Sequence, residues 1–177
     1  VGHGSFNPRF VISAGGILEY PDETGGVSGN SGDYITNRVG GLIRKSAGTG
    51  TNTIDWAVHN AGTIDVQTGA LLFNEGGNVG GGLTMASGSR VILGNGTFNM
   101  LDGGSSTGAG TLVVSAPANA LAGATYGANS RVELVAGGGL GGGAGIFAAN
   151  GSFDISGGTV NDGGSLDLNG TGTVTGG

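Results

Sequence analysis

A short unit that begins with glycine recurs through residues 60–114, and it constrains the fold more than any other feature of the chain. In each unit apolar residues stand at the second and fourth positions after the glycine. This period of two is typical of a β-strand with one buried face, and glycine lets the chain turn before the strand. The units are Gly62 with Ile64 and Val66, Gly69 with Leu71 and Phe73, Gly81 with Leu83 and Met85, Gly96 with Phe98 and Met100, and Gly110 with Leu112 and Val114.

The spacing of these units favours a coil of stacked strands. Three strands complete a period of roughly 20 residues, a length at which solenoids are the first fold to consider. An antiparallel sandwich or barrel is the alternative, but its strands recur every ~8–12 residues. In a parallel coil the glycines line up at the corners and the strands stack about 4.8 Å apart. We therefore expect an all-β fold, a single-stranded parallel β-helix (β-solenoid) with about 20 residues per three-strand coil and about nine coils, some 40 Å long.

The composition of the chain argues against several classes of structure and of binding partner. Of the 177 residues 44 are glycine, yet no triplet period is present and only three residues are proline, so a collagen-like repeat is excluded. The formal net charge of −6 argues against nucleic acid and anionic membranes as partners, since both attract clustered Lys and Arg. Cysteine is absent, so the chain has no disulfide and no thiolate metal site. No apolar run reaches the ~18 residues of a membrane-spanning helix, and we expect no membrane insertion.

We expect a single domain over residues 1–177. The repeat pattern continues into residues 170–177, which favours a fragment of a longer protein. Residues 1–46 are less regular and form either early coils with a longer loop or a cap over one end of the stack. Residues 47–177 form the regular coils, with loops protruding between 115 and 150. Strands are expected within 1–46 at 10–12, 17–20 and 39–43, around a turn-rich run at 21–32.

The interior of the coil is expected to be narrow and apolar. The alternation places one set of side chains inside every coil and leaves the set between them outside. The residues expected to fill the interior include Ile64, Val66, Phe73, Phe98, Leu112, Phe153 and Leu166.

The repeats resemble those of bacterial surface β-solenoids, namely autotransporter passenger segments and filamentous-haemagglutinin-type secreted exoproteins. The similarity is carried by GGLIRKSAGTGTNT at 40–53, NAGTIDVQTGALLFNEGG at 60–77, LTMASGSRVILGNGTFNM at 83–100 and GAGTLVVS at 108–115. This resemblance implies a right-handed parallel β-helix that is secreted or displayed on the bacterial cell surface. It also implies a stalk, scaffold or adhesive role.

Carboxylates offer the first set of candidate site residues. Parallel β-helices also carry polysaccharide lyases and glycoside hydrolases, and glycosidases need two carboxylates about 5–9 Å apart. Asp55 and Asp65 are the candidate catalytic pair, with Trp56 and His59 nearby in sequence. The opposing interpretation makes Trp56 a core residue that shares a face with Ile54, and makes His59 and Asp55 an ordinary surface pair.

An outward row of oxygen ligands offers a second possibility. Asp65, Asp154 and Asp167 occupy the third position after a leading glycine and are the candidate ligands for Ca²⁺. The alternative is a solvated polar face. No pattern for a cofactor is present, and none is expected. Threonine follows several of the leading glycines, as ice-binding arrays do, although Thr also suits any strand; these residues are Thr63, Thr97, Thr111, Thr159 and Thr173.

The function expected from these observations is non-catalytic. We expect an extracellular scaffold, stalk or adhesin, with host or matrix glycans or proteins bound through the loops at 21–32 and 116–129. A carbohydrate-active enzyme is the alternative, and an ice-binding or self-assembling filament module a lesser one. End-to-end self-association follows as a possibility from the unpaired edges of an open coil.

Overall fold

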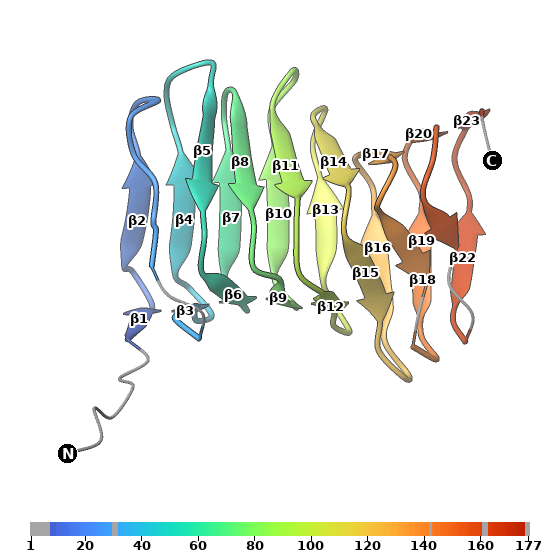
Figure 1. Ribbon diagram of the computed structural model, residues 1–177, viewed down its shortest axis with the longest axis horizontal. Helices are drawn as coiled ribbons and strands as arrows, with labels where there is room; N and C mark the ends of the chain where they lie inside the picture. The colour runs from blue at the N-terminus through green and yellow to red at the C-terminus, as the bar shows by residue number, and fades with distance from the viewer. Residues whose placement is uncertain (1–7, 30–31, 142, 161–162, 176–177) are drawn as a thin grey trace.

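The chain forms a rod of stacked β-strands. The computed structural model describes residues 8–29, 32–141, 143–160 and 163–175, and these contain 23 strands and no helix. Every strand pair is parallel, and the strands make three sheets, each of which runs along the rod (Figure 1). The first strand and the last lie at opposite ends.

Each sheet takes every third strand along the chain. Sheet A consists of β1 (Arg9–Ile12), β3 (Tyr34–Asn37), β6 (Ala57–Asn60), β9 (Gly77–Val79), β12 (Phe98–Met100), β15 (Pro117–Ala120), β18 (Gly139–Gly141) and β21 (Thr159–Val160). Sheet B consists of β2 (Ile17–Tyr20), β4 (Leu42–Lys45), β7 (Thr63–Val66), β10 (Gly82–Met85), β13 (Ser105–Thr107), β16 (Thr125–Ala128), β19 (Ile146–Ala149) and β22 (Ser165–Leu168). Sheet C consists of β5 (Thr51–Ile54), β8 (Ala70–Phe73), β11 (Arg90–Leu93), β14 (Thr111–Val114), β17 (Arg131–Leu134), β20 (Phe153–Ile155) and β23 (Gly172–Val174).

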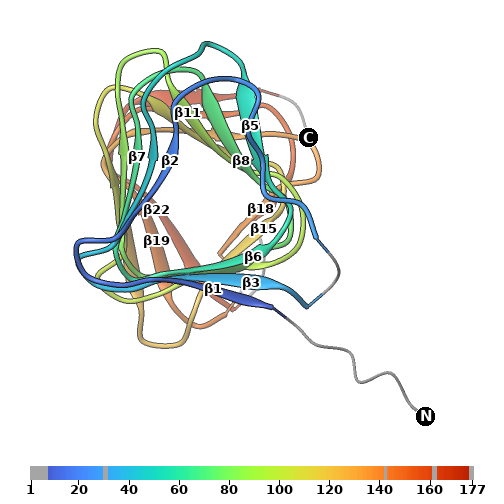
Figure 2. The ribbon, with the colours of Figure 1, turned by 90° about the vertical axis from the view of Figure 1, so that its left-hand side faces the viewer.

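The expected β-solenoid is confirmed. Seen from the end that holds β1, the chain runs clockwise as it recedes, so the coil is right-handed (Figure 2). It makes about 8 turns of roughly 21 residues, close to the predicted period. The number of turns is smaller than the nine expected because each turn takes slightly more residues than estimated.

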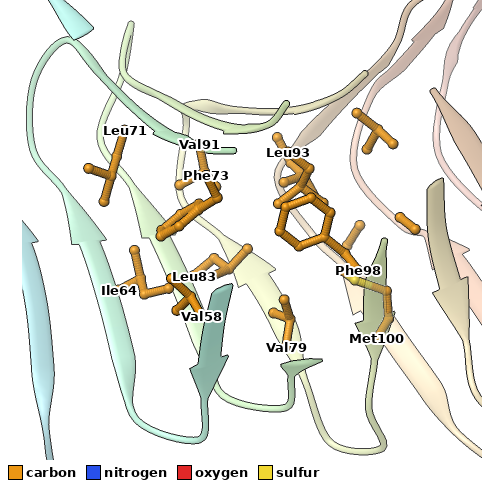
Figure 3. Packing of buried hydrophobic residues seen from close by; sticks show 14 of the residues in the cluster. Val58, Ile64, Leu71, Phe73, Val79, Leu83, Val91, Leu93, Phe98 and Met100 are labelled. Atoms are coloured by element: carbon orange, nitrogen blue, oxygen red, sulfur yellow. The ribbon is translucent and has the colours of Figure 1, made fainter. Parts of the chain in front are cut away.

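The alternation in the sequence correctly identifies the interior. Ile64, Val66, Phe73, Phe98 and Leu112 are all buried, and they pack in one continuous cluster with the neighbouring coils (Figure 3). Phe153 and Leu166 also pack against this cluster, but they are only partly buried because they lie close to the end of the rod. The interior void among Val58, Ile64, Phe98 and their neighbours is only about 10 Å³, so the core is dry and closely packed.

One glycine shows how tightly the coils stack. Gly77 opens β9 with φ of 134°, and a Cβ atom there would lie 2.1 Å from the backbone oxygen of Val58 in the coil below. Any other residue would therefore be both strained and in collision. Phe98 lies opposite Gly77 in the next coil and is buried.

The first coil differs from the others on its third side. The strands expected at 10–12 and 17–20 are present as β1 and β2, but residues 21–29 contribute no strand to sheet C. Only Val27 bridges to this sheet, by pairing with Ile54. The turn-rich sequence explains the difference, because Asp22 accepts hydrogen bonds from the backbone nitrogen and hydroxyl of Thr24, at 2.9 and 2.7 Å, and closes a local turn.

The strand expected at 39–43 is displaced. The observed strand β4 begins at Leu42, and Val39 lies in the preceding turn with 75% of its surface exposed. Gly40 adopts φ of 78°, which belongs to a turn and not to a strand. The extended backbone of β4 therefore begins after this turn.

The expectation of loops between 115 and 150 is wrong for most of that segment. Five strands, β15 to β19, continue the three sheets through it and are joined by short turns. The inward positions there include Ala118, Ala120 and Ala128, all fully buried. Because alanine and glycine give a weak hydrophobic pattern, the strands of these coils were taken for protruding loops.

Candidate functional site

The outer face of sheet B carries charged and hydroxyl side chains from three neighbouring strands. A shallow groove of about 400 Å³ lies over β4, β7 and β10, and its lining includes Arg44, Thr63, Asp65 and Thr84. Arg44 and Asp65 stand opposite each other on neighbouring strands because the coil period brings residues 21 apart into register. The groove is therefore a direct product of the stacking.

The carboxylate of Asp65 is oriented by two donors. Nε of Arg44 donates to Oδ2 of Asp65 at 3.1 Å, and Nε2 of Gln67 donates to the same oxygen at 2.9 Å. The other oxygen, Oδ1, has no hydrogen-bond partner among the described residues. The site can thus offer an incoming hydroxyl or amide one fixed acceptor, together with the remaining guanidinium N–H groups of Arg44.

Asp55 lies elsewhere on the coil. It sits in the corner between β5 and β6, where Nδ2 of Asn74 donates to its Oδ1 at 3.0 Å. Asp65 lies two sides further on, at the centre of β7 in sheet B, so all of β6 separates the two residues. The carboxylates are on different sides of the rod and each has its own partner.

Trp56 and His59 do not join either carboxylate. Trp56 occupies the same corner and packs against the core cluster, as the core interpretation expected, and its Nε1 is buried without a partner among the described residues. His59 lies on the outer face of β6 and makes an edge-on contact with the ring of Tyr34, at 5.5 Å between centroids. These aromatic residues therefore stabilise the early coils.

The three candidate calcium ligands are spread along the rod. Asp65 and Asp167 belong to sheet B but are separated by β10, β13, β16 and β19, while Asp154 belongs to sheet C. Asp154 receives hydrogen bonds from Arg131 at 3.4 Å and Thr173 at 3.0 Å, and Asp167 receives one from Ser165. Within the described ranges no three His, Cys, Asp or Glu residues gather closely enough to hold a metal ion.

The threonines considered for ice binding do not share a face. Thr63 lies on sheet B, Thr111 and Thr173 on sheet C, Thr159 on sheet A, and Thr97 in a corner. A flat array of threonines is therefore not formed by this set.

Comparisons with models of protein families, with curated proteins and with solved structures find no match. A search of the described residues for a helix long and apolar enough to cross a membrane also finds none. The groove and its surroundings must therefore be interpreted from their own geometry.

A buried polar cluster was not anticipated from the sequence. Lys45 occupies an inward position of β4 and is fully buried. Its Nζ donates to the side-chain oxygen of Asn52 at 2.6 Å and to the backbone oxygen of Ala47 at 2.9 Å. Nδ2 of Asn52 in turn donates to the backbone oxygen of Gly25, so the cluster ties the loop of the first coil to the second.

The same loop is held from outside by Glu23. Its Oε1 accepts hydrogen bonds from the backbone nitrogens of Gly50, at 2.8 Å, and of Thr49, and from the hydroxyl of Thr49 at 3.1 Å. These donors, led by Gly50, lower the pKa of Glu23 below its ordinary value of 4.5. Glu23 and the buried cluster together fasten residues 21–26 to the corner that precedes β5.

Asparagine side chains also bind one another between coils, and Nδ2 of Asn99 donates to Oδ1 of Asn78 at 2.9 Å. Inside the rod Nδ2 of Asn37 donates to Oδ1 of Asn60 at 2.7 Å. Outside, Asn150 donates to Asn129 at 3.1 Å and Asn169 donates to Asn150 at 2.9 Å, so each carboxamide binds the one in the preceding coil. The signal in the sequence is the recurrence of Asn at intervals close to one coil.

One inward aromatic pair depends on a glycine in a neighbouring coil. Tyr126 is fully buried and stacks on Phe147, with 5.4 Å between ring centroids. A Cβ atom on Gly104 would come within 2.8 Å of the ring of Tyr126, so the ring fills the space left by this glycine. Burial raises the pKa of the Tyr126 phenol well above its usual range, and it raises the pKa of Tyr20 to about 12.

Proposed function

We propose that this chain is a non-catalytic structural segment, a rigid scaffold or stalk with an adhesive outer face, in a secreted or surface protein of a bacterium. The observation that carries the proposal is the continuous stacking of three sheets around one closely packed, mainly apolar core. Such a stack has no hinge within it and holds its ends at a fixed separation. The bacterial surface setting rests on the similarity of the repeats at 40–53, 60–77, 83–100 and 108–115 to surface solenoids.

The polar outer surface supports this role. Two arginines on the sheets pair with an aspartate of the adjacent coil, Arg44 with Asp65 and Arg131 with Asp154. Catalytic pairs of carboxylates are instead expected to face each other across a cleft. Asp55 and Asp65 lie on different sides, and this separation favours a scaffold over the carbohydrate-active alternative.

The groove on sheet B is the place where we expect recognition. It combines an oriented carboxylate, a guanidinium and the hydroxyls of Thr63 and Thr84 on a flat, rigid base. A glycan or a polar segment of a matrix protein carries the hydroxyl and amide groups that such a surface can bind. Of the two loops expected to carry recognition, only the one at 21–29 is seen as a loop among the described residues. It lies one coil away from the groove.

The test is a binding screen on glycans and matrix proteins combined with a reducing-sugar assay on the same sample. We expect binding without turnover, and we expect Arg44→Ala or Asp65→Asn to abolish the binding. Arg131→Ala is the matched control, because it removes the corresponding Arg–Asp pair on sheet C and leaves the groove intact. Turnover of a polysaccharide that is lost in Asp65→Asn and kept in Asp154→Asn would overturn the non-catalytic role.

A further inference from the structure

The only lysine of the sequence lies inside the rod. Lys45 is the last residue of β4, and its side chain is fully buried. Its partners in the strands before and after it are Tyr20 and Val66, which are buried as well. Lysine is almost never fully buried unless it is paired. The one side-chain amine of the chain is thus held where water does not reach it.

The carboxamide of Asn52 lies directly against this amine. Asn52 has an inward position in β5 and is 1% exposed. Nζ of Lys45 and Oδ1 of Asn52 are 2.6 Å apart. Because a C=O bond is about 1.2 Å long, the carbonyl carbon Cγ lies at most about 3.8 Å from Nζ. Atoms that are ready to react lie about 3–3.5 Å apart, and the terminal torsion of asparagine is soft, so a small rotation of the carboxamide turns its carbonyl face toward Nζ.

Further hydrogen bonds orient both groups. Nζ of Lys45 also donates to the backbone oxygen of Ala47 at 2.9 Å, and Nδ2 of Asn52 donates to the backbone oxygen of Gly25. The carboxamide therefore presents its oxygen to the amine and its nitrogen to the loop of the first coil. Residues 21–26 of that loop are all exposed, so the carboxamide nitrogen points toward the surface through a wall one segment thick.

We propose that Lys45 and Asn52 join in an intramolecular isopeptide bond after the chain has folded. The lone pair of Nζ forms a bond to Cγ, the bond between Cγ and Nδ2 breaks, and Nδ2 leaves with the electrons of that bond. Nδ2 also takes up two of the three protons of the Lys45 ammonium. A side-chain ammonium and a carboxamide thus become a secondary amide and a free ammonium ion, and nothing is oxidised or reduced.

The surroundings favour the product over the reactants. The reaction removes a positive charge from an interior that cannot solvate it. The new amide N–H can keep the hydrogen bond to Ala47, and the buried neighbours Tyr20, Val66 and Leu71 keep out the water that would hydrolyse the bond. Neither acceptor of Nζ is a base that takes up its protons, so conversion is slow and freshly folded protein still contains the hydrogen-bonded ammonium.

The bond closes the corner between β4 and β5 covalently. Glu23 binds the backbone of Thr49 and Gly50 in the same corner, so the cross-link also fixes the place where the loop of the first coil is fastened. This modification does not depend on recognition by the groove on sheet B, and it goes beyond the role of the chain as a scaffold.

Intact-mass spectrometry of the folded chain during a prolonged incubation tests this proposal. We expect a loss equal to the mass of one ammonia molecule, in a fraction of the protein that rises with time. Trypsin locates the change, because it does not cleave after an acylated lysine. The peptide that otherwise begins at Ser46 is expected to stay joined to Lys45 and to lack one ammonia.

Two variants each remove one reactant, and a third is the matched control. Lys45→Arg and Asn52→Ala are expected to keep their full mass. Asn99→Ala removes a carboxamide that is paired with Asn78 instead of with an amine, and it is expected to lose ammonia as the unmodified chain does. Circular dichroism shows whether each variant keeps its β-structure, and the tryptic map of the unmodified chain remains decisive if one does not.

An unmodified chain that keeps its full mass throughout the incubation, with complete cleavage after Lys45, overturns the proposal. A loss of ammonia that persists in Lys45→Arg also contradicts it, because the nitrogen that attacks would then be a backbone nitrogen beside another asparagine. Incubation in urea is expected to stop the cross-link, since unfolding separates the two side chains.

Discussion

Inside the second coil, Nζ of Lys45 donates a hydrogen bond of 2.6 Å to the side-chain oxygen of Asn52. Both residues are buried, and both occupy inward positions that are apolar in the next coil, at Val66 and Leu71. A buried ammonium depends on its acceptors because it has lost the water that would otherwise solvate it. The free energy of unfolding should therefore respond very differently to substitution of one residue of the pair and to substitution of both.

Replacing Asn52 with Leu should destabilise the fold by about 3 kcal/mol, because it leaves the Lys45 ammonium short of an acceptor. The double variant Lys45→Met with Asn52→Leu should recover most of that loss, since it continues the apolar rows of the next coil. Urea unfolding of the two single variants and the double variant measures the coupling. If the two losses simply add, the pair does not act as a unit.

Truncation of Phe98 tests the interior directly. Phe98→Ala should cost about 3–5 kcal/mol, because it removes a buried ring and leaves a cavity above Gly77. Phe98→Asp should prevent folding, since it places an unpaired charge inside the coil. Val39→Asp on the exposed side of the rod serves as the control and should shift stability by less than about 0.5 kcal/mol. Unchanged denaturation of Phe98→Asp would mean that the inward register is incorrect.

Gly77 should tolerate no side chain. Gly77→Ala combines a strained φ of 134° with a Cβ only 2.1 Å from the Val58 oxygen, so the stacking of β9 on β6 must open. We expect a clear fall in melting temperature by calorimetry. Gly88→Ala is a useful comparison, because Gly88 also has a positive φ, of 78°, but open space around its Cβ. Equal losses in the two variants would show that backbone strain alone matters and that the close approach does not.

The hydrogen bonds to Glu23 predict a dependence on pH. Because the pKa of Glu23 is lowered in the folded protein, its contribution to stability is present above the ordinary value of 4.5 and is lost as pH falls through the lower, folded value. The unmodified chain should therefore melt at a higher temperature than Glu23→Gln near neutral pH, and the difference should shrink in acid. A difference for Glu23→Gln that persists well below pH 4.5 would argue against the loop fastening.

Local alternation was sufficient to predict the regular coils. In a unit such as Gly62 with Ile64 and Val66, five consecutive positions indicate both the turn and the buried face of the strand. The same rule fails where alternation continues through a corner. Ile54, Trp56 and Val58 alternate without a break, yet the chain bends at Asp55 and Trp56 and passes from sheet C to sheet A.

Other features depend on partners that the alternation of apolar residues does not reveal. The buried Tyr126 needs Gly104 in the neighbouring coil, and the inward Lys45 needs Asn52 and the backbone of Ala47 in its own coil. A lysine at an inward position contradicts the alternation unless its acceptors are known.

The groove on sheet B could have been recognised once the coil period was applied to charged residues. Arg44 lies 21 positions before Asp65, and Arg131 lies 23 before Asp154, so both ion pairs follow the stacking distance. By contrast, Asp55 and Asp65 are closer in sequence. Because less than one full coil separates them, they lie on different sides of the rod. For this fold, residues that meet on the surface are those separated by a whole coil.

The strands of each coil contact chiefly the strands directly before and after them in the stack. Duplication or loss of one stretch of roughly 21 residues would therefore leave the contacts of all other coils intact and change the length of the rod by one strand spacing, about 4.8 Å. The stretch of sequence that is duplicated or lost is thus the same stretch that sets one step in the length of the rod. The length of such a protein can evolve in fixed steps without redesign of its core.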